Sequence, residues 1–98
     1  MARIELAPEI LDDFDRILDH LTQNSVEDAR GRIREIIQAI DVLEHNPLIG
    51  RPVSAETREL VIGRRARGDV ALYRYIEQID TVIVLAIRSQ REAGFGRT

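Results

Sequence analysis

The spacing of apolar residues changes once along the chain, and this change constrains the fold more than any other feature. Between residues 10 and 43, apolar side chains recur every three or four positions, as they do on one face of a helix. They are Ile10, Phe14, Ile17, Leu18 and Leu21 in a first stretch, and Val26, Ala29, Ile33, Ile36, Ile37, Ile40 and Leu43 in a second. From residue 58 onwards, short apolar runs bounded by turn residues indicate strands instead. The chain is therefore predicted to place two helices before a sheet.

Prolines and a capping residue predict where the two helices begin and end. The first opens at Pro8, a residue that suits the first helical turn, and runs to about Gln23. The second has Ser25 at its start, in the position of an N-cap. It ends near His45–Asn46, because Pro47 disfavours helix in the residue before it. Since only a two-residue break separates the helices, we expect them to form a hairpin.

Four short segments have the alternation or the composition of β-strands. They are Arg3–Leu6, Arg58–Ile62, Val70–Glu77 and Thr81–Arg88. The last contains a continuous apolar run from 82 to 87, which is typical of a central strand covered on both faces. The chain is thus predicted to be one α+β domain spanning 1–98, in the order βααβββ, with the helical hairpin packed on one face of an antiparallel sheet. We expect a flexible tail from about residue 89.

The sheet face opposite the helices is left open, and we expect the functional surface there. Alternation along the last strand assigns the bulkier set to the helix side, namely Ile83, Leu85 and Ile87, and the other set to the open face, namely Val82, Val84, Ala86 and Arg88. Because arginine is rarely buried, Arg74 is placed on the open face beside Arg88. Such a pair suits a phosphate or carboxylate partner. The alternative is that both arginines pair with acids such as Glu59 or Glu77.

Charge is distributed unevenly along the chain, which has a net charge of −3. Residues 1–49 hold 5 Arg and 11 acidic residues, a net charge of −6, whereas residues 50–98 hold 9 Arg and 6 acidic residues, a net charge of +3. The two halves are suited to different neighbours, or are simply two solvated surfaces. All 14 basic residues are arginine, so no lysine is present to lose a proton near neutral pH.

Several classes of site are not expected. Cysteine is absent, which excludes disulfides and thiolate metal sites and favours a cytoplasmic location. No apolar run is long enough to cross a membrane. His20 and His45 stand apart in the sequence and do not suggest a metal site, and the basic loop from Gly63 to Gly68 joins strands, so it lacks the context of a phosphate-binding loop. We expect neither a metal nor a cofactor.

Three stretches taken together resemble the RelE/ParE superfamily of toxins from type II toxin–antitoxin systems. They are residues 46–52 after the second predicted helix, residues 58–62 followed by 70–75, and residues 82–93. The resemblance covers almost the whole chain, and it implies the same fold as the residue pattern. It also implies a cognate antitoxin that wraps a helix and an extended segment around the toxin and binds operator DNA with its other end.

The RelE branch of this superfamily comprises ribosome-dependent mRNA endonucleases, and the resemblance implies which residues such chemistry would need. The family's two sheet lysines fall on Glu59 and Val61, and its sheet arginine falls on or next to Val70. The tail arginine is matched by Arg91, whereas the only candidate for the tail tyrosine is Phe95, which has no proton to give. Most of the groups for general acid–base catalysis are therefore missing.

The ParE branch fits better, because its members keep the fold, lack the nuclease residues and poison DNA gyrase by direct binding. This resemblance implies a gyrase-inhibiting toxin neutralised by a ParD-like antitoxin of ribbon-helix-helix type, with no catalytic residues. From charge and expected exposure, the residues predicted to contact the target are Arg51, Arg58, Arg74, Arg88 and Arg91. The alternative is an mRNA endonuclease of RelE type.

Overall fold

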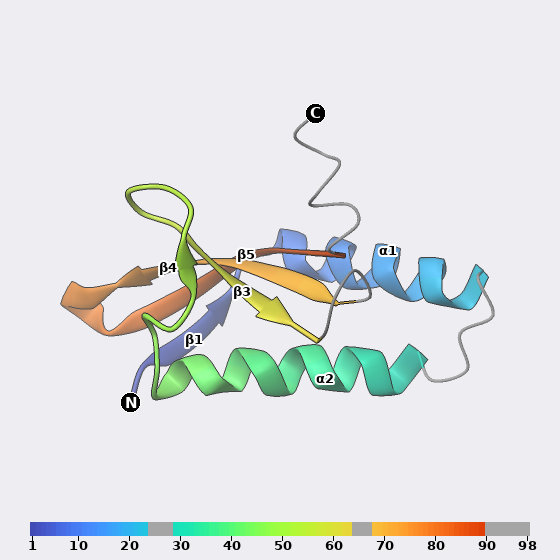
Figure 1. The fold of residues 1–98 in the computed structure, drawn as a ribbon, viewed down its shortest axis with the longest axis horizontal. Coiled ribbons are helices and arrows are strands. Elements are labelled where there is room, and N and C mark those ends of the chain that lie inside the picture. Colours follow the sequence, from blue (N-terminus) through green and yellow to red (C-terminus); the bar gives the residue numbers. More distant parts are fainter. Residues whose placement is uncertain (24–28, 64–67, 90–98) are drawn as a thin grey trace.

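The computed structural model describes residues 1–23, 29–63 and 68–89. An N-terminal strand precedes two helices, and a meander of strands follows them (Figure 1). In chain order the elements are β1 (Arg3–Leu6), α1 (Glu9–Gln23), α2 (Ala29–Asp41), the 3-10 turn η1 (Val42–Glu44), β2 (Arg51–Pro52), β3 (Arg58–Ile62), β4 (Asp69–Ile76), the 3-10 turn η3 (Glu77–Ile79) and β5 (Thr81–Ser89). The predicted α+β class and βααβββ order are confirmed. The N-cap predicted at Ser25 and the predicted flexible tail lie outside the described residues, apart from the end of β5.

Helix α2 ends earlier than predicted. Regular α-helix stops at Asp41, and a 3-10 turn carries the chain to His45. Pro47 lies just beyond this turn and restricts the residue before it, which accounts for the tightened last turn.

The five strands form one sheet in the order β1-β5-β4-β3-β2. Strands β3, β4 and β5 make the predicted antiparallel meander, and β5 is an interior strand as its apolar run indicated. Strand β1, however, pairs with β5 in parallel, so the sheet is mixed rather than antiparallel throughout. The short strand β2, which lies in the predicted turn-rich connection, adds the other edge.

The hydrophobic core lies between the two helices and one face of the sheet. Helix α1 packs chiefly along β5, and α2 reaches β3, while the loop after β2 rises on the side away from α2 (Figure 1). The helices contribute the buried apolar side chains of Ile10, Ile17, Ile36 and Ile40. The sheet contributes those of Ile62, Ala71, Tyr73, Val82, Val84 and Ile87. Most of the described residues of the two predicted stripes therefore face the core, but Leu18 and Ile37 do not, since 39% and 47% of their surfaces are exposed.

A β-bulge in the β4–β5 ladder changes which side chains of β5 face the helices. Leu72 pairs with Ala86, but the next residue, Tyr73, pairs with Val84, so Leu85 has no partner of its own. The extra residue shifts the alternation by one position. Val82 and Val84 are consequently fully buried in the core, and the assignment of Val82, Ile83 and Val84 by simple alternation is wrong. The assignment of Ala86, Ile87 and Arg88 holds.

Helix α1 is fixed to β5 by polar side chains as well as by apolar packing. Beyond the end of β1, the backbone N–H of Ile87 donates to Asp13 Oδ2 at 2.9 Å, and the Ile87 carbonyl accepts from Arg16 Nη2 at 3.0 Å. Arg16 Nη1 also lies 2.9 Å from Asp13 Oδ1, so the two side chains hold each other in place. A carboxylate and a guanidinium thus take the place that a neighbouring strand would fill. We call Asp13 and Arg16 the α1 clip.

A second buried ion pair joins α2 to the start of β4. Arg32 Nε lies 2.8 Å from Asp69 Oδ2, and the Asp69 side chain is almost completely buried. Such pairs are costly to break from one side, because the remaining charge stays buried.

In the part of the chain that the structure describes, no helix is long and apolar enough to cross a membrane.

Candidate functional site

The face of the sheet that the helices do not cover is the candidate functional surface, and we call it the open face. Strand register arranges its side chains in rows across the sheet. The rows are Val61–Val70–Arg88, then Arg51–Glu59–Leu72–Ala86, then Arg74–Ile83–Glu5. The bulge does not change which side chains of β4 point to the open face. On β5, it places Ile83 on the open face, where simple alternation predicted Val84. Apolar residues therefore occupy the centre, and charged residues occupy the borders.

The apolar centre is partly accessible. Leu72, Ile83 and Ala86 are half-buried, and Val61 keeps 52% of its surface exposed. Val61 therefore adds exposed apolar surface to this centre. An apolar centre surrounded by arginines has the composition of a protein-binding surface.

Arg74 and Arg88 both lie exposed on the open face, as predicted, but they are not beside each other. Arg74 is opposite Ile83, whereas Arg88 is opposite Val70, four residues further along β4. At the usual rise of a strand this separates them by roughly 13 Å. The correction follows from the antiparallel register, which alternation within one strand cannot supply.

Each of these arginines faces one acid at long range. Arg74 Nη2 is 3.6 Å from Glu56 Oε1, and Arg88 Nη1 is 4.0 Å from Asp13 Oδ1. The alternative that both arginines meet acids therefore holds, although Glu56 and Asp13 take the places expected for Glu59 and Glu77. Exposed pairs of this length bind weakly, so both guanidinium groups stay accessible to a partner.

Arg51 and Arg58 have different roles in the structure. Arg51 is exposed on β2 and forms an ion pair with Glu59 on the open face. Arg58 is paired with Tyr73, on the helix side of the sheet, and its Nη1 donates to the carbonyls of Leu48 at 3.1 Å and Gly50 at 2.8 Å. Arg58 thus supports the connection before β2 and does not lie on the open face. Arg91 lies outside the described residues.

Tyr73 holds the same connection from the core side. The Gly50 N–H donates to the Tyr73 hydroxyl at 2.8 Å, and the tyrosine is fully buried. Burial raises the pKa of the Tyr73 phenol above its ordinary value, while the Gly50 hydrogen bond and the charge of Arg58 act in the opposite direction. A Cβ at Gly50 would lie 2.6 Å from the tyrosine ring and its hydroxyl. The sequence offered only Gly50 within a turn-rich stretch as a signal of this contact.

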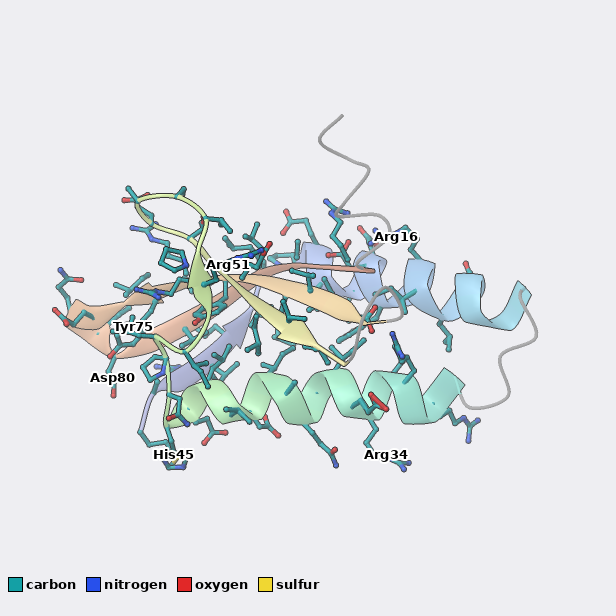
Figure 2. The ribbon with its side chains drawn as sticks, viewed as in Figure 1. Arg16, Arg34, His45, Arg51, Tyr75 and Asp80 are labelled. Atoms are coloured by element: carbon teal, nitrogen blue, oxygen red, sulfur yellow. The ribbon has the colours of Figure 1, made fainter. Side chains whose placement is uncertain are left out.

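A groove of about 310 Å³ runs between the loop after β2 and strand β4. Its lining combines polar and apolar side chains, namely Leu48, Pro52, Ser54, Ala55, Glu56, Thr57, Arg58, Arg74 and Tyr75. The Tyr75 hydroxyl donates to Asp80 Oδ1 at 2.7 Å near the tip of the sheet (Figure 2). That hydrogen bond is the main reason that the pKa of Tyr75 is raised. Sequence reasoning missed this groove, because the path of the loop decides it.

The sheet positions that match nuclease residues of the RelE branch, Glu59, Val61 and Val70, lie together on the open face but carry other groups. Glu59 is engaged by Arg51, and Val61 pairs with Val70 across the β3–β4 ladder. Phe95, like Arg91, lies outside the described residues. Among the described residues, no group of histidine and carboxylate side chains is placed to hold a metal ion.

Comparison with known families gives a match over nearly the whole chain. Residues 4–94 match the family described as the ParE toxin of the type II toxin–antitoxin system parDE. No curated protein is similar enough in sequence to count as a match.

Solved structures with the same fold come from both branches of the superfamily. The chromosomal ParDE toxin–antitoxin system of P. aeruginosa contains a chain with a TM-score of 0.73 at 22% identity, covering 91% of this chain and 96% of that one. A mutant of the E. coli toxin RelE in the free state has a TM-score of 0.62 at 11% identity, covering 96% and 90%. The archaeal RelE–RelB complex of Pyrococcus horikoshii has a TM-score of 0.56 at 11% identity, covering 91% and 94%. At these identities the likeness shows the fold alone.

Proposed function

Because the chain belongs to the ParE toxin family of type II toxin–antitoxin systems, we propose that it stops growth by binding DNA gyrase through the open face of its sheet. The family match makes the protein the toxin component of such a system. The gyrase target, the contact surface and the type of antitoxin are the proposal.

The observation that carries this proposal is the composition of the open face. An exposed apolar residue, Val61, stands among buried and half-buried apolar neighbours, and arginines border them. Arginine is enriched among the residues that dominate binding energy at interfaces, and its planar group binds carboxylates in a fixed geometry. Arg74 and Arg88 are the strongest candidates for contact with the target, with Arg51 at the adjoining edge. Arg58 supports the site from behind, and Arg91 remains a candidate from the sequence alone.

The same face argues against cleavage of RNA as the toxic activity. Cleavage by attack of the ribose 2′-hydroxyl needs a base, an acid and positive charge at the phosphate. Where the related nucleases carry lysines, this chain has Glu59, already paired with Arg51, and the apolar Val61. The chain also contains no lysine elsewhere. Binding without catalysis is therefore the activity that these residues support.

We further propose a ParD-like antitoxin that covers exposed apolar side chains on the helical side. Leu11 and Leu18 lie seven residues apart on α1, with 71% and 39% of their surfaces exposed. Seven residues is two helical turns, so both lie on one outward face. An amphipathic helix of the antitoxin would bury them.

We also propose that the toxin acts in the bacterial cytoplasm, because DNA gyrase, its proposed target, works there.

The test is the supercoiling of relaxed plasmid by purified gyrase. We expect supercoiling to fall as the toxin is added and to recover when the cognate antitoxin is added in equal amount. A translating cell extract provides the opposing assay. Intact supercoiling combined with cleavage of messenger RNA in that extract would overturn the proposal in favour of a RelE-type endonuclease.

A further inference from the structure

We propose that the groove between the loop after β2 and strand β4 binds an acidic side chain, in an extended segment of a partner protein, and that Glu56 occupies this site internally until the partner binds. This carboxylate site is separate from the apolar centre of the open face. It does not depend on gyrase being the partner.

The first support is the geometry of Glu56 and Arg74. Glu56 extends from the loop toward β4, and its Oε1 stops 3.6 Å from Arg74 Nη2. Their side chains keep 69% and 44% of their surfaces exposed. The contact is longer than a charge-assisted hydrogen bond and open to solvent, so it adds little stability. An incoming carboxylate can replace Glu56 with shorter bonds to the same guanidinium group.

The second support is the balance of charge in the groove. Its lining holds two guanidinium groups, Arg58 and Arg74, but a single carboxylate, Glu56. Arg58 Nη1 is committed to two backbone carbonyls, which are neutral, so its positive charge is not cancelled there. Asp80 does not line the groove; its carboxylate accepts from the Tyr75 hydroxyl and lies 3.9 Å from the N-terminal ammonium group. The groove therefore has one positive charge in excess beside Arg74.

The third support is that the loop is held in shape by its own bonds. Thr57 and Glu56 donate their N–H groups to Ser54 Oγ, at 3.1 Å and 3.3 Å, and the Val53 N–H donates to the Thr57 carbonyl at 3.0 Å. A site that is already ordered loses less entropy when it binds a ligand. The loop is thus a fixed wall of the groove.

Apolar side chains in the groove lining indicate which residue flanks the acidic one in the ligand. Leu48 keeps 56% of its surface exposed, and Pro52 and Ala55 line the groove beside it. These side chains suit an apolar residue next to the acidic one in the partner segment. A nucleic-acid ligand is disfavoured, because the chain carries a net charge of −3 and binding to phosphate backbones depends on excess positive charge.

The test is an NMR titration of the ¹⁵N-labelled protein with the capped tripeptide acetyl-Leu-Glu-Leu-amide, with acetyl-Leu-Gln-Leu-amide as its neutral counterpart. We expect the acidic peptide to shift signals of residues 52–58 and 74–75, and the neutral peptide to bind at least fivefold more weakly. In the Glu56→Gln variant, the affinity for the acidic peptide should rise about threefold to fivefold, as expected for removal of a weak internal competitor. In Arg74→Gln, the shifts should disappear.

Arg34 and Glu35 supply matched controls, since they are an exposed arginine and an exposed glutamate on α2 and do not line the groove. Arg34→Gln and Glu35→Gln should leave the affinity unchanged, and unperturbed spectra away from the groove will show that every variant folds. The proposal is overturned by equal affinity for the two peptides, by an unchanged affinity in Glu56→Gln, or by tighter binding of a short oligonucleotide than of the acidic peptide.

Discussion

Gly50 shows how one residue without a side chain fixes a functional edge. Its N–H donates to the buried hydroxyl of Tyr73, and its carbonyl accepts from Arg58. The connection that leads into β2, and hence the position of Arg51, depends on these two bonds. A glycine is required here because of close approach, since the ring of Tyr73 occupies the space that a Cβ would need.

We therefore expect Gly50→Ala to destabilise the protein by about 1–3 kcal/mol, because the added methyl group must displace Tyr73 or the backbone of β3. Urea unfolding followed by circular dichroism measures the change. Ala55→Gly, on the exposed loop, is a control that should change stability by less than about 1 kcal/mol. A Gly50→Ala protein as stable as the parent would mean that the connection packs differently.

We expect tyrosine ionisation to set how the free energy of unfolding changes near pH 10, because the chain has 2 Tyr and neither lysine nor cysteine. The pKa of Tyr73 is raised in the folded state from its ordinary value of 10.0, mainly by burial. The unfolded chain therefore loses this proton at a lower pH than the folded protein does. Stability from this group is complete below pH 10.0 and is lost as pH rises through the folded pKa.

The prediction is a fall in the free energy of unfolding above about pH 10, with a shallower fall in Tyr73→Phe. Tyr75 contributes with the same sign, because its hydrogen bond to Asp80 raises its pKa too. Urea titrations at a series of pH values measure both slopes. An identical slope in Tyr73→Phe would show that the phenol is not protected from ionisation.

The limits of sequence reasoning at this scale are clear from the arginines. Exposure of Arg74 and Arg88 follows from charge and alternation, and was predicted. The orientation of Arg58 was not, because its five-residue strand is too short for alternation to decide, and only the loop carbonyls explain why it turns inward. The pairing of Arg74 with Glu56 depends on a loop path that local composition does not determine.

At the scale of elements, α1 and β5 form the joint that decides how the helices sit on the sheet. Strand β1 covers β5 only as far as Val84, and the α1 clip satisfies the backbone of Ile87 beyond it. Side chains of a helix can do this because a carboxylate accepts as a carbonyl does, and a guanidinium donates as a backbone N–H does.

Replacing the acidic half of the clip should loosen this joint. We expect Asp13→Ala to cost about 2–3 kcal/mol, since the buried N–H of Ile87 loses its acceptor and Arg16 loses its ion pair with Asp13. Asp15→Ala, an exposed position on the same helix, should cost about 0.5 kcal/mol or less. Thermal unfolding of the two variants tests the comparison, and equal melting temperatures would rule out a structural role for the clip.

The elements themselves were largely predictable, because helical and strand periodicities leave strong patterns in the sequence. Two features were not. The bulge at Leu85 lies within an unbroken apolar run, so one extra residue leaves no mark in the pattern. The parallel pairing of β1 with β5 joins segments far apart in the chain, and its short length gives no signal of direction.

At the scale of the molecule, the uneven distribution of charge has a spatial counterpart. The outward side of α1 carries the exposed carboxylates of Asp12, Asp15 and Asp19, whereas the open face carries Arg51, Arg74 and Arg88. Different surfaces are thus available to two partners. This agrees with the proposal that the antitoxin covers the helical side while the target meets the sheet.

The central claim is that the open face inhibits gyrase by binding it, and supercoiling by purified gyrase in the presence of matched variants tests this most directly. The double variant Arg74→Gln/Arg88→Gln should need at least about tenfold more protein for half-inhibition than the parent, a loss of about 1.4 kcal/mol of binding. Arg34→Gln, an exposed arginine on α2, should stay within about twofold of the parent. Full potency in the double variant, or a parent protein that leaves supercoiling unchanged, would contradict the account.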